Sequence, residues 1–322
     1  MRRLGFALAM ILPPAAPAAA GGFALHWPVD CTLGQDCYIQ QYVDHDPGPG
    51  AQDFTCSGLS YDGHKGTDIA LPFLSDMHAG VGVLAAADGV VAGTRDGMAG
   101  RLATGKSAEA VAGRECGNGV VIRHAGGWET QYCHLKNGSV RVRSGDKVAA
   151  GTPLGEIGLS GQTQFPHLHL SLRKNGAVAD PFQIGPQEGC GAGGAQLWAE
   201  DVPYGPGGLT GGGFHTEIPD YADVKAGRAD LAPLAADAPA LVFWTLAYGG
   251  RKGDEITLSA TGPEGEVFRQ RAVLEKPQAQ LFRAAGKRLK TDRWPAGAYT
   301  GTAILMRNGK EISRYSQKME IR

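Results

Sequence analysis

Glycine is the feature of this sequence that most limits what the chain can fold into. The chain has 49 glycines among 322 residues, about twice the usual share in globular proteins. Glycine weakens helices and is favoured in tight turns, and no Gly-X-Y period indicates a collagen helix. Aromatic residues make up only 7% of the chain. We therefore predict a mainly β protein with many turns and few long helices.

The first twenty residues have the pattern of a secretory signal peptide. Arg2 and Arg3 precede a short apolar run, and a series of small residues ends with three alanines at Ala20. The apolar run is far shorter than the ~20 residues that cross a bilayer, and the paired prolines after it disfavour a buried helix. We predict cleavage after Ala20, export to the periplasm or the extracellular space, and no membrane span.

The six cysteines all lie beyond the predicted signal peptide. An even number of cysteines in an exported chain indicates disulfides. The expected pairs are Cys31–Cys37, Cys116–Cys133 and Cys56–Cys190. The first pair is close in sequence, the second flanks a hairpin predicted around residues 125–127, and the third remains by elimination. Strict antiparallel register around that hairpin would miss the second pair by a few residues.

The charge balance excludes one class of partner. The chain has 31 Lys and Arg residues against 32 Asp and Glu residues. Proteins that bind nucleic acid usually carry a basic excess or a basic stripe. We therefore expect no nucleic-acid partner.

Changes in pattern divide the rest of the chain into four segments. Residues 21–60 are loop-rich and contain three cysteines, and residues 61–185 contain short strands separated by glycine turns. Residues 186–215 are very rich in glycine and are predicted to be a linker. Residues 216–322 lack cysteine and contain alternating strands. We predict that they form a small immunoglobulin-like β-sandwich, an accessory domain, after the compact antiparallel domain of residues 61–185.

The strands expected in the first domain cover residues 89–93, 119–123, 130–135 and 167–173. Those expected in the sandwich cover residues 241–248, 255–260, 266–271, 297–306 and 311–321.

Four of the nine histidines stand in informative positions. His64 and Asp68 share a segment in which two glycines oppose a helix, so a loop that feeds a strand can bring the imidazole and the carboxylate to one metal ion. His167 and His169 are two apart on a predicted strand, which places both imidazoles on one face. His134 follows Cys133, and alternation places the two side chains on opposite faces, with the histidine facing a cleft.

Together these pieces resemble the lysostaphin-type (M23) zinc metallopeptidases that cut bacterial cell walls. The resemblance rests on H-x3-D at residues 64–68, a lone histidine in a Y-x-H-L context at residues 132–135, and H-x-H at residues 167–169, in that order. It covers about residues 60–185 and leaves the C-terminal hundred residues uncovered.

The resemblance implies one zinc ion with His64, Asp68 and His169 as ligands. Three protein ligands leave a fourth tetrahedral position for water, as a catalytic zinc requires. His134 and His167 would be the two free imidazoles: one helps to deprotonate the water, and the other stabilises the oxyanion or protonates the leaving amine. The sequence does not assign which does which. No H-E-x-x-H motif supplies a glutamate base.

The function implied is an exported zinc endopeptidase that hydrolyses amide bonds in peptidoglycan peptides. The alternative is a non-catalytic protein that binds the wall or activates an amidase and retains the metal site. Two histidines and a carboxylate also suit a non-haem iron oxygenase, although that class gives His134 no role. The sequence of the C-terminal domain contains no recognisable site. This domain could bind the wall, bind a protein partner or cover the groove.

Overall fold

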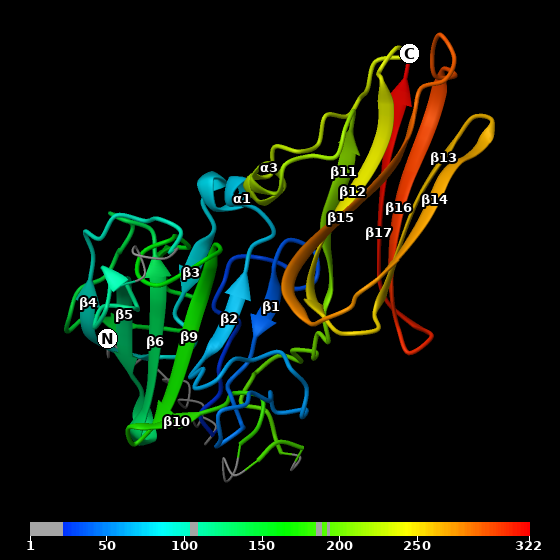
Figure 1. The fold of residues 1–322 in the computed structure, drawn as a ribbon. Helices are drawn as coiled ribbons and strands as arrows, with labels where there is room; N and C mark the ends of the chain where they lie inside the picture. Colours follow the sequence, from blue (N-terminus) through cyan, green and yellow to red (C-terminus); the bar gives the residue numbers. More distant parts are fainter. Residues whose placement is uncertain (1–21, 104–108, 185–188, 192–193) are drawn as a thin grey trace, which may run out of the picture.

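The computed structural model describes residues 22–103, 109–184, 189–191 and 194–322, and the predicted signal peptide lies outside them. The described chain forms two lobes of mainly β structure (Figure 1). Its helices α1 (Leu74–Ala79) and α3 (Tyr221–Ala226) are short, which confirms the mainly β fold class. Among the described residues, no helix has the length and apolar character needed to cross a membrane.

The first lobe is built on one eight-stranded antiparallel sheet. Its main path runs β1-β2-β9-β6-β5-β4-β7, and β10 (Ala177–Ala179) pairs with β9 outside this path. The strands of the path are β1 (Tyr38–Gln41), β2 (Thr67–Ala70), β9 (His167–Lys174), β6 (Trp128–Leu135), β5 (Asn118–Arg123), β4 (Gly89–Arg95) and β7 (Lys147–Val148). β3 (Gly82–Leu84) and β8 (Pro153–Glu156) form a small second sheet. All four strands predicted for this domain are confirmed.

Alternation along β9 gives the large sheet two different faces. Leu168, Leu170 and Leu172 are fully buried in the main apolar core. His167 and His169 lie on the opposite face, where they line a cleft. The period of two in the sequence therefore places the leucines in the core and the imidazoles in the cleft.

The second lobe is a sandwich of two antiparallel sheets that share one core. One sheet has the order β11-β12-β15 and the other β14-β13-β16-β17. The seven strands match the number in an immunoglobulin constant-type sandwich, but the fourth strand pairs with the third and not with the fifth. The strands are β11 (Gly208–His215), β12 (Ala240–Gly250), β13 (Glu255–Gly262), β14 (Gly265–Val273), β15 (Gln278–Arg288), β16 (Gly297–Arg307) and β17 (Lys310–Ile321).

Two of these strands differ from the sequence prediction. The predicted linker, residues 186–215, includes β11, which pairs with β12. β11 contains a run of three glycines, and Gly212 and Gly213 lie against Tyr315 and Asp230 so closely that a Cβ would not fit. The sequence analysis interprets these glycines as part of a flexible linker, but in the structure they allow close packing between strands. The sequence pattern also predicts no strand at β15, because its alanines and basic residues suit a helix equally well.

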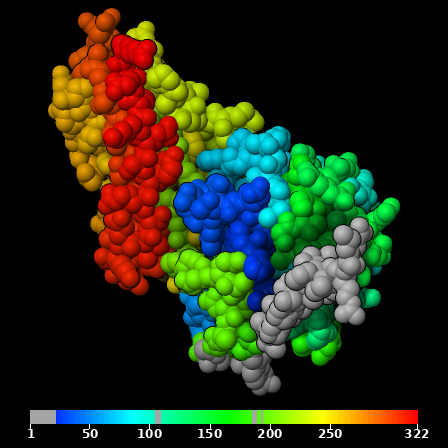
Figure 2. Space-filling model, turned by 180° about the vertical axis from the view of Figure 1, so that it is seen from behind, coloured from blue at the N-terminus to red at the C-terminus, as the bar shows by residue number. Residues whose placement is uncertain are grey.

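The two lobes meet along a packed interface. Phe73, just before α1, lies against Gly211 and near the Trp244 ring of the sandwich. Tyr38 of β1 contacts Tyr248 of β12 with ring centroids 4.3 Å apart. From behind, the first described residues of the chain, in dark blue, lie between the lobes (Figure 2). The N-terminal segment therefore helps to attach the sandwich to the first domain.

All three expected disulfides are present: Cys31–Cys37, Cys56–Cys190 and Cys116–Cys133. The third pair is off the strand register, as the sequence indicated. The chain turns at Gly117, whose φ is +65°, so that Cys116 folds back beside β6 and its carbonyl accepts a hydrogen bond from the His134 amide.

A buried ion pair joins the N-terminal segment to the end of the first domain. His45 Nε2 lies 2.7 Å from Asp180 Oδ2, and neither side chain is exposed. Burial alone would lower the pKa of His45, but the hydrogen bond to Asp180 and its negative charge raise the pKa above its usual value. The folded chain therefore holds the His45 proton more tightly than the unfolded chain does.

This pair makes stability depend on pH. Because the folded-state pKa is raised, its contribution is complete below about pH 6.5, the ordinary histidine pKa, and is lost as the pH rises through the folded-state value. We expect this contribution to the free energy of unfolding, measured in urea, to decrease as the pH rises above about 6.5. His45→Gln should flatten this dependence, whereas His78→Gln, at an exposed position, should leave it unchanged. Equal slopes in wild type and His45→Gln would contradict the assignment.

Candidate metal centre

Strand pairing brings two of the predicted ligands together. β2 pairs with β9 in a register that sets Asp68 opposite His169 and Ala70 opposite His167. Residues directly opposite in an antiparallel pair have side chains on the same face. The loop before β2 carries His64 to the same place, and Gly66 in this loop lies so close to His169 that a Cβ would be 2.6 Å from its Nε2.

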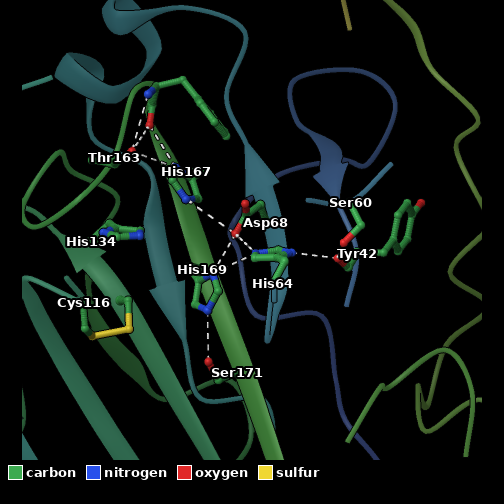
Figure 3. A network of polar contacts seen from close by, with 12 residues as sticks. Tyr42, Ser60, His64, Asp68, Cys116, His134, Thr163, His167, His169 and Ser171 are labelled. Carbon is green, nitrogen blue, oxygen red and sulfur yellow. Dashed lines mark hydrogen bonds and ion pairs between the residues drawn. A yellow bond between two sulfur atoms is a disulfide. The ribbon is translucent and has the colours of Figure 1, made fainter. Parts of the chain in front are cut away.

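The three predicted ligands converge on one point (Figure 3). His64 Nε2 lies 3.2 Å from Asp68 Oδ1 and 3.2 Å from His169 Nδ1, and His169 Nδ1 lies 2.8 Å from Asp68 Oδ1. His64 and Asp68 are buried, and His169 is partly exposed. Residues 64, 68 and 169 are therefore brought together as the sequence predicts.

The outer nitrogen of each ligand histidine already has a partner. His64 Nδ1–H donates to the Tyr42 carbonyl oxygen at 2.7 Å, and His169 Nε2 lies 3.0 Å from Ser171 Oγ. Because a carbonyl only accepts, the first bond places the lone pair of neutral His64 on its inner nitrogen. This is the outer-shell arrangement that metal-binding histidines usually have.

The two remaining histidines lie beside this group and are oriented in the same way. His134 Nδ1–H donates to the Ser160 carbonyl at 2.8 Å, and His167 Nδ1–H donates to the Phe165 carbonyl at 2.9 Å. Their ring centroids are 4.6 Å apart. His167 Nε2 is 3.5 Å from Asp68 Oδ1. Both rings thus leave Nε2 free as a hydrogen-bond acceptor.

His134 faces the cleft as predicted, but not because of strand alternation. Alternation would place Cys133 and His134 on opposite faces, but Cys133 pairs with His169 in the sheet and both Cys133 and His134 line the cleft. The backbone of His134 has a φ of +66°, which breaks the alternation. This is a costly conformation for a residue with a Cβ. The amide bond to the Cys116 carbonyl and the adjacent disulfide hold it in place.

The electrostatics of the group favour an ionised carboxylate at Asp68 and neutral rings at His134 and His167. Burial alone would raise the pKa of Asp68, but the neighbouring His64 and His167 hold it well below its usual value. Burial also lowers the pKa of His64, yet the Asp68 charge raises it overall. Burial lowers the pKa of His167, and burial together with His167 lowers that of His134 well below its usual value. Both of these rings are therefore neutral at pH 7.

The donor set suits a zinc ion. Two imidazole nitrogens and one carboxylate oxygen are common zinc ligands, with bonds of about 2.0–2.2 Å. Ligand atoms around such a tetrahedral ion lie about 3.3 Å apart, within about half an ångström of the three separations found here. A second group of potential ligands, Cys31, Asp36 and Cys37, does not suit a metal because its two cysteines are joined to each other.

The centre lies in a cleft of about 1140 Å³. Most hydrogen-bond partners of its histidines are not identified by the sequence. Tyr42, Ser160 and Phe165 act through backbone carbonyls, which no residue type reveals. Ser171, by contrast, is two residues from His169 on the same strand face and could have been identified by alternation.

Comparisons with known proteins agree with this geometry. Residues 62–181 match the family model "Peptidase family M23". The DD-carboxypeptidase/endopeptidase Mpg of Neisseria meningitidis is 35% identical over 121 residues, 38% of this chain and 22% of that protein. The peptidoglycan DD-endopeptidase ShyA of Vibrio cholerae is 34% identical over 109 residues, 34% of this chain and 20% of that protein. The chain thus spans about a fifth of the length of these curated relatives.

Among solved structures, the catalytic domain of the prophage-encoded M23 protein EnpA from Enterococcus faecalis aligns at 27% identity with a TM-score of 0.34. The alignment covers 51% of this chain and 99% of that one. The family match includes all five side chains of the centre, from His64 to His169. Residues 62–181 of the chain are therefore similar to peptidase family M23.

Proposed function

We propose that this protein is a zinc-dependent endopeptidase that hydrolyses amide bonds in the peptides of peptidoglycan. The observation that carries the proposal is the convergence of five side chains in one cleft: three with ligand atoms within 4.8 Å of one another, and two with free nitrogens beside them. The names of the curated relatives support peptidoglycan as the substrate. Complete retention of the five side chains favours catalysis over a purely binding role.

His64, Asp68 and His169 would hold the ion. When bound, zinc lowers the pKa of its water towards 7 and polarises the scissile carbonyl. The chain's own contribution is to keep the ligand atoms of the three side chains aimed inward. The Tyr42 carbonyl and the Ser171 hydroxyl do this by occupying the outer nitrogens, and the low pKa of Asp68 keeps its charge.

His134 and His167 would move the proton. Each ring is neutral and presents an unprotonated Nε2 to the cleft, so the pair can accept a proton from the attacking water and return one to the leaving amine. A ring that has become protonated can donate a hydrogen bond to the carbonyl oxygen as that oxygen gains charge. The Ser160 and Phe165 carbonyls anchor the rings for this task.

The proposed site of action lies outside the cytoplasm, in the periplasm or beyond. Three disulfides join the six cysteines, and such bonds persist in oxidising compartments. The signal-like pattern of residues 1–20 is consistent with export.

The ligand assignment predicts loss of both metal and activity. In His64→Ala, Asp68→Ala or His169→Ala, one of three ligands is missing, so zinc content should fall well below one ion per chain and hydrolysis of peptidoglycan should stop. Elemental analysis and turbidity assays of purified sacculi measure the two effects. His78→Ala is a matched control at an exposed position. Full activity in a ligand variant would contradict the assignment, and iron instead of zinc in the wild type would favour an oxygenase.

The assignment of His134 and His167 as acid and base predicts loss of activity without loss of zinc. His134→Ala and His167→Ala should retain zinc and lose about 10²–10⁴-fold in kcat, the usual contribution of a general acid or base. Unchanged kcat in both variants, with zinc retained, would contradict the two-histidine assignment. Wall turnover in cells that is unchanged in both variants, with no hydrolysis by the purified wild type, would support the non-catalytic alternative.

Direct digestion identifies the bond. The mature protein, incubated with purified peptidoglycan, should release new amine and carboxyl ends in the peptide part, and a chelator should prevent their appearance. Mass spectrometry of the fragments measures both results. New ends in the glycan strands, or none at all, would contradict an endopeptidase.

A further inference from the structure

The cleft beside the metal centre has a second wall, which comes from the C-terminal sandwich lobe. Tyr221 and Lys225 of α3 and Ala279 and Gln280 of β15 line the same cleft as Asp68 and the histidines. These four residues lie outside residues 62–181, which match the peptidase family. The cleft is therefore completed by a part of the chain to which the family match assigns no role.

Direct contacts fix this wall in place. Gln40 Nε2, in β1, donates to the Ala279 carbonyl at 2.8 Å, and Gln280 Nε2 donates to the Tyr38 hydroxyl at 3.1 Å. Gly227, which ends α3, lies against Phe73 and Ser75 next to α1 so closely that a Cβ would not fit. Figure 1 shows α1 and α3 side by side at the junction of the two lobes. The wall thus has a defined position relative to the metal centre.

The charged group on this wall is the ammonium of Lys225, which lies beside an aromatic ring. Lys225 Nζ lies 4.8 Å from the centre of the Tyr221 ring, and that ring stacks on Phe282 of β15 with centroids 5.3 Å apart. Among the described lining residues, Lys225 is the one lysine or arginine. It also has no ion pair within the described part of the chain.

The acidic groups of the same cleft already have partners. Asp68 is surrounded by His64, His167 and His169. Glu115, on the facing wall, accepts a hydrogen bond from the Gly113 amide at 2.6 Å. Lys225 lines the cleft but has no carboxylate partner among the described residues. Such a cation is suited to bind a carboxylate of the ligand.

The uncharged lining is suited to a peptide chain. It is rich in side-chain amides, each of which can both donate to and accept from peptide groups. These are Gln40, Gln41, Gln131, Gln162, Gln164 and Gln280. Two of the six stand on β1 and one on the sandwich, so the amide groups occur on both sides of the lobe junction.

We propose that the sandwich forms a substrate subsite in which Lys225 binds a carboxylate of the peptide being cut. The sandwich then acts as a specificity wall of the active-site cleft. This inference rests on the proposed function in that the ligand is a peptide.

The test compares two forms of one ligand. A synthetic cross-linked stem peptide with a fluorescent label is prepared once with free carboxylates and once with every carboxylate amidated. Kd is measured by fluorescence anisotropy in the presence of chelator, so that no hydrolysis occurs, and kcat/KM is measured with zinc. For the wild type we expect the free-carboxylate form to bind about tenfold more tightly, as one charge-assisted contact provides.

Matched variants separate the charge from the fold. Lys225→Gln should bind both peptides with equal Kd, and Lys225→Arg should restore most of the preference. Lys290→Gln removes an exposed lysine of the same sandwich that is not in the cleft lining and should behave as wild type. Thermal unfolding should be unchanged in all three.

The outcomes for the two proposals differ. A wild-type Kd that is equal for the two peptides, or a preference that survives in Lys225→Gln, overturns the subsite, even if the protein cleaves both peptides. If the preference is present and Lys225-dependent but neither peptide nor peptidoglycan is cleaved with zinc, the subsite stands and the endopeptidase proposal is overturned.

Discussion

The antiparallel pairing of β2 with β9 is the constraint on which the centre depends. It sets Asp68 directly opposite His169, so that one buried carboxylate meets the imidazoles of His64, His167 and His169. A one-residue slip would turn these side chains into the core and bring the leucines of β9 into the cleft. The buried leucines resist such a slip, so the same alternation that builds the core also holds the ligands in register.

Around this pairing, the first domain fixes each imidazole by its outer nitrogen. Three of the four partners are backbone carbonyls, those of Tyr42, Ser160 and Phe165. Backbone groups on a packed sheet and its loops move little, so these bonds hold the rings in defined orientations. His134 needs the strongest support because of its left-handed backbone, and it receives that support from Cys116.

The sequence was most informative where a pattern is local. H-x3-D, H-x-H and the lone histidine identified the five side chains that meet in the cleft, and alternation placed the edges of the nine strands that it predicted to within about two residues. It predicted no strand for the short β1, β2, β3, β7, β8 and β10. Prediction from the sequence failed where one residue type is compatible with two different local structures. The glycines of β11 resembled a linker, because a sequence does not distinguish glycine used for flexibility from glycine used for close packing. The sequence correctly predicts that His134 faces the cleft, but for the wrong reason. The strand alternation behind that prediction is broken by the positive φ of His134.

The sequence by itself determined the chemistry: which side chains could hold a metal, which cysteines could pair, and that strands would predominate. These follow from residue types and short spacings, which the chain carries whatever its fold. Only the tertiary structure decided how the cleft is closed. Lys225 and Gln280 line the same cleft as Asp68 and His169 because the two lobes pack through Phe73, Tyr38 and Gln40. Contacts between residues more than a hundred positions apart leave no local pattern in the sequence.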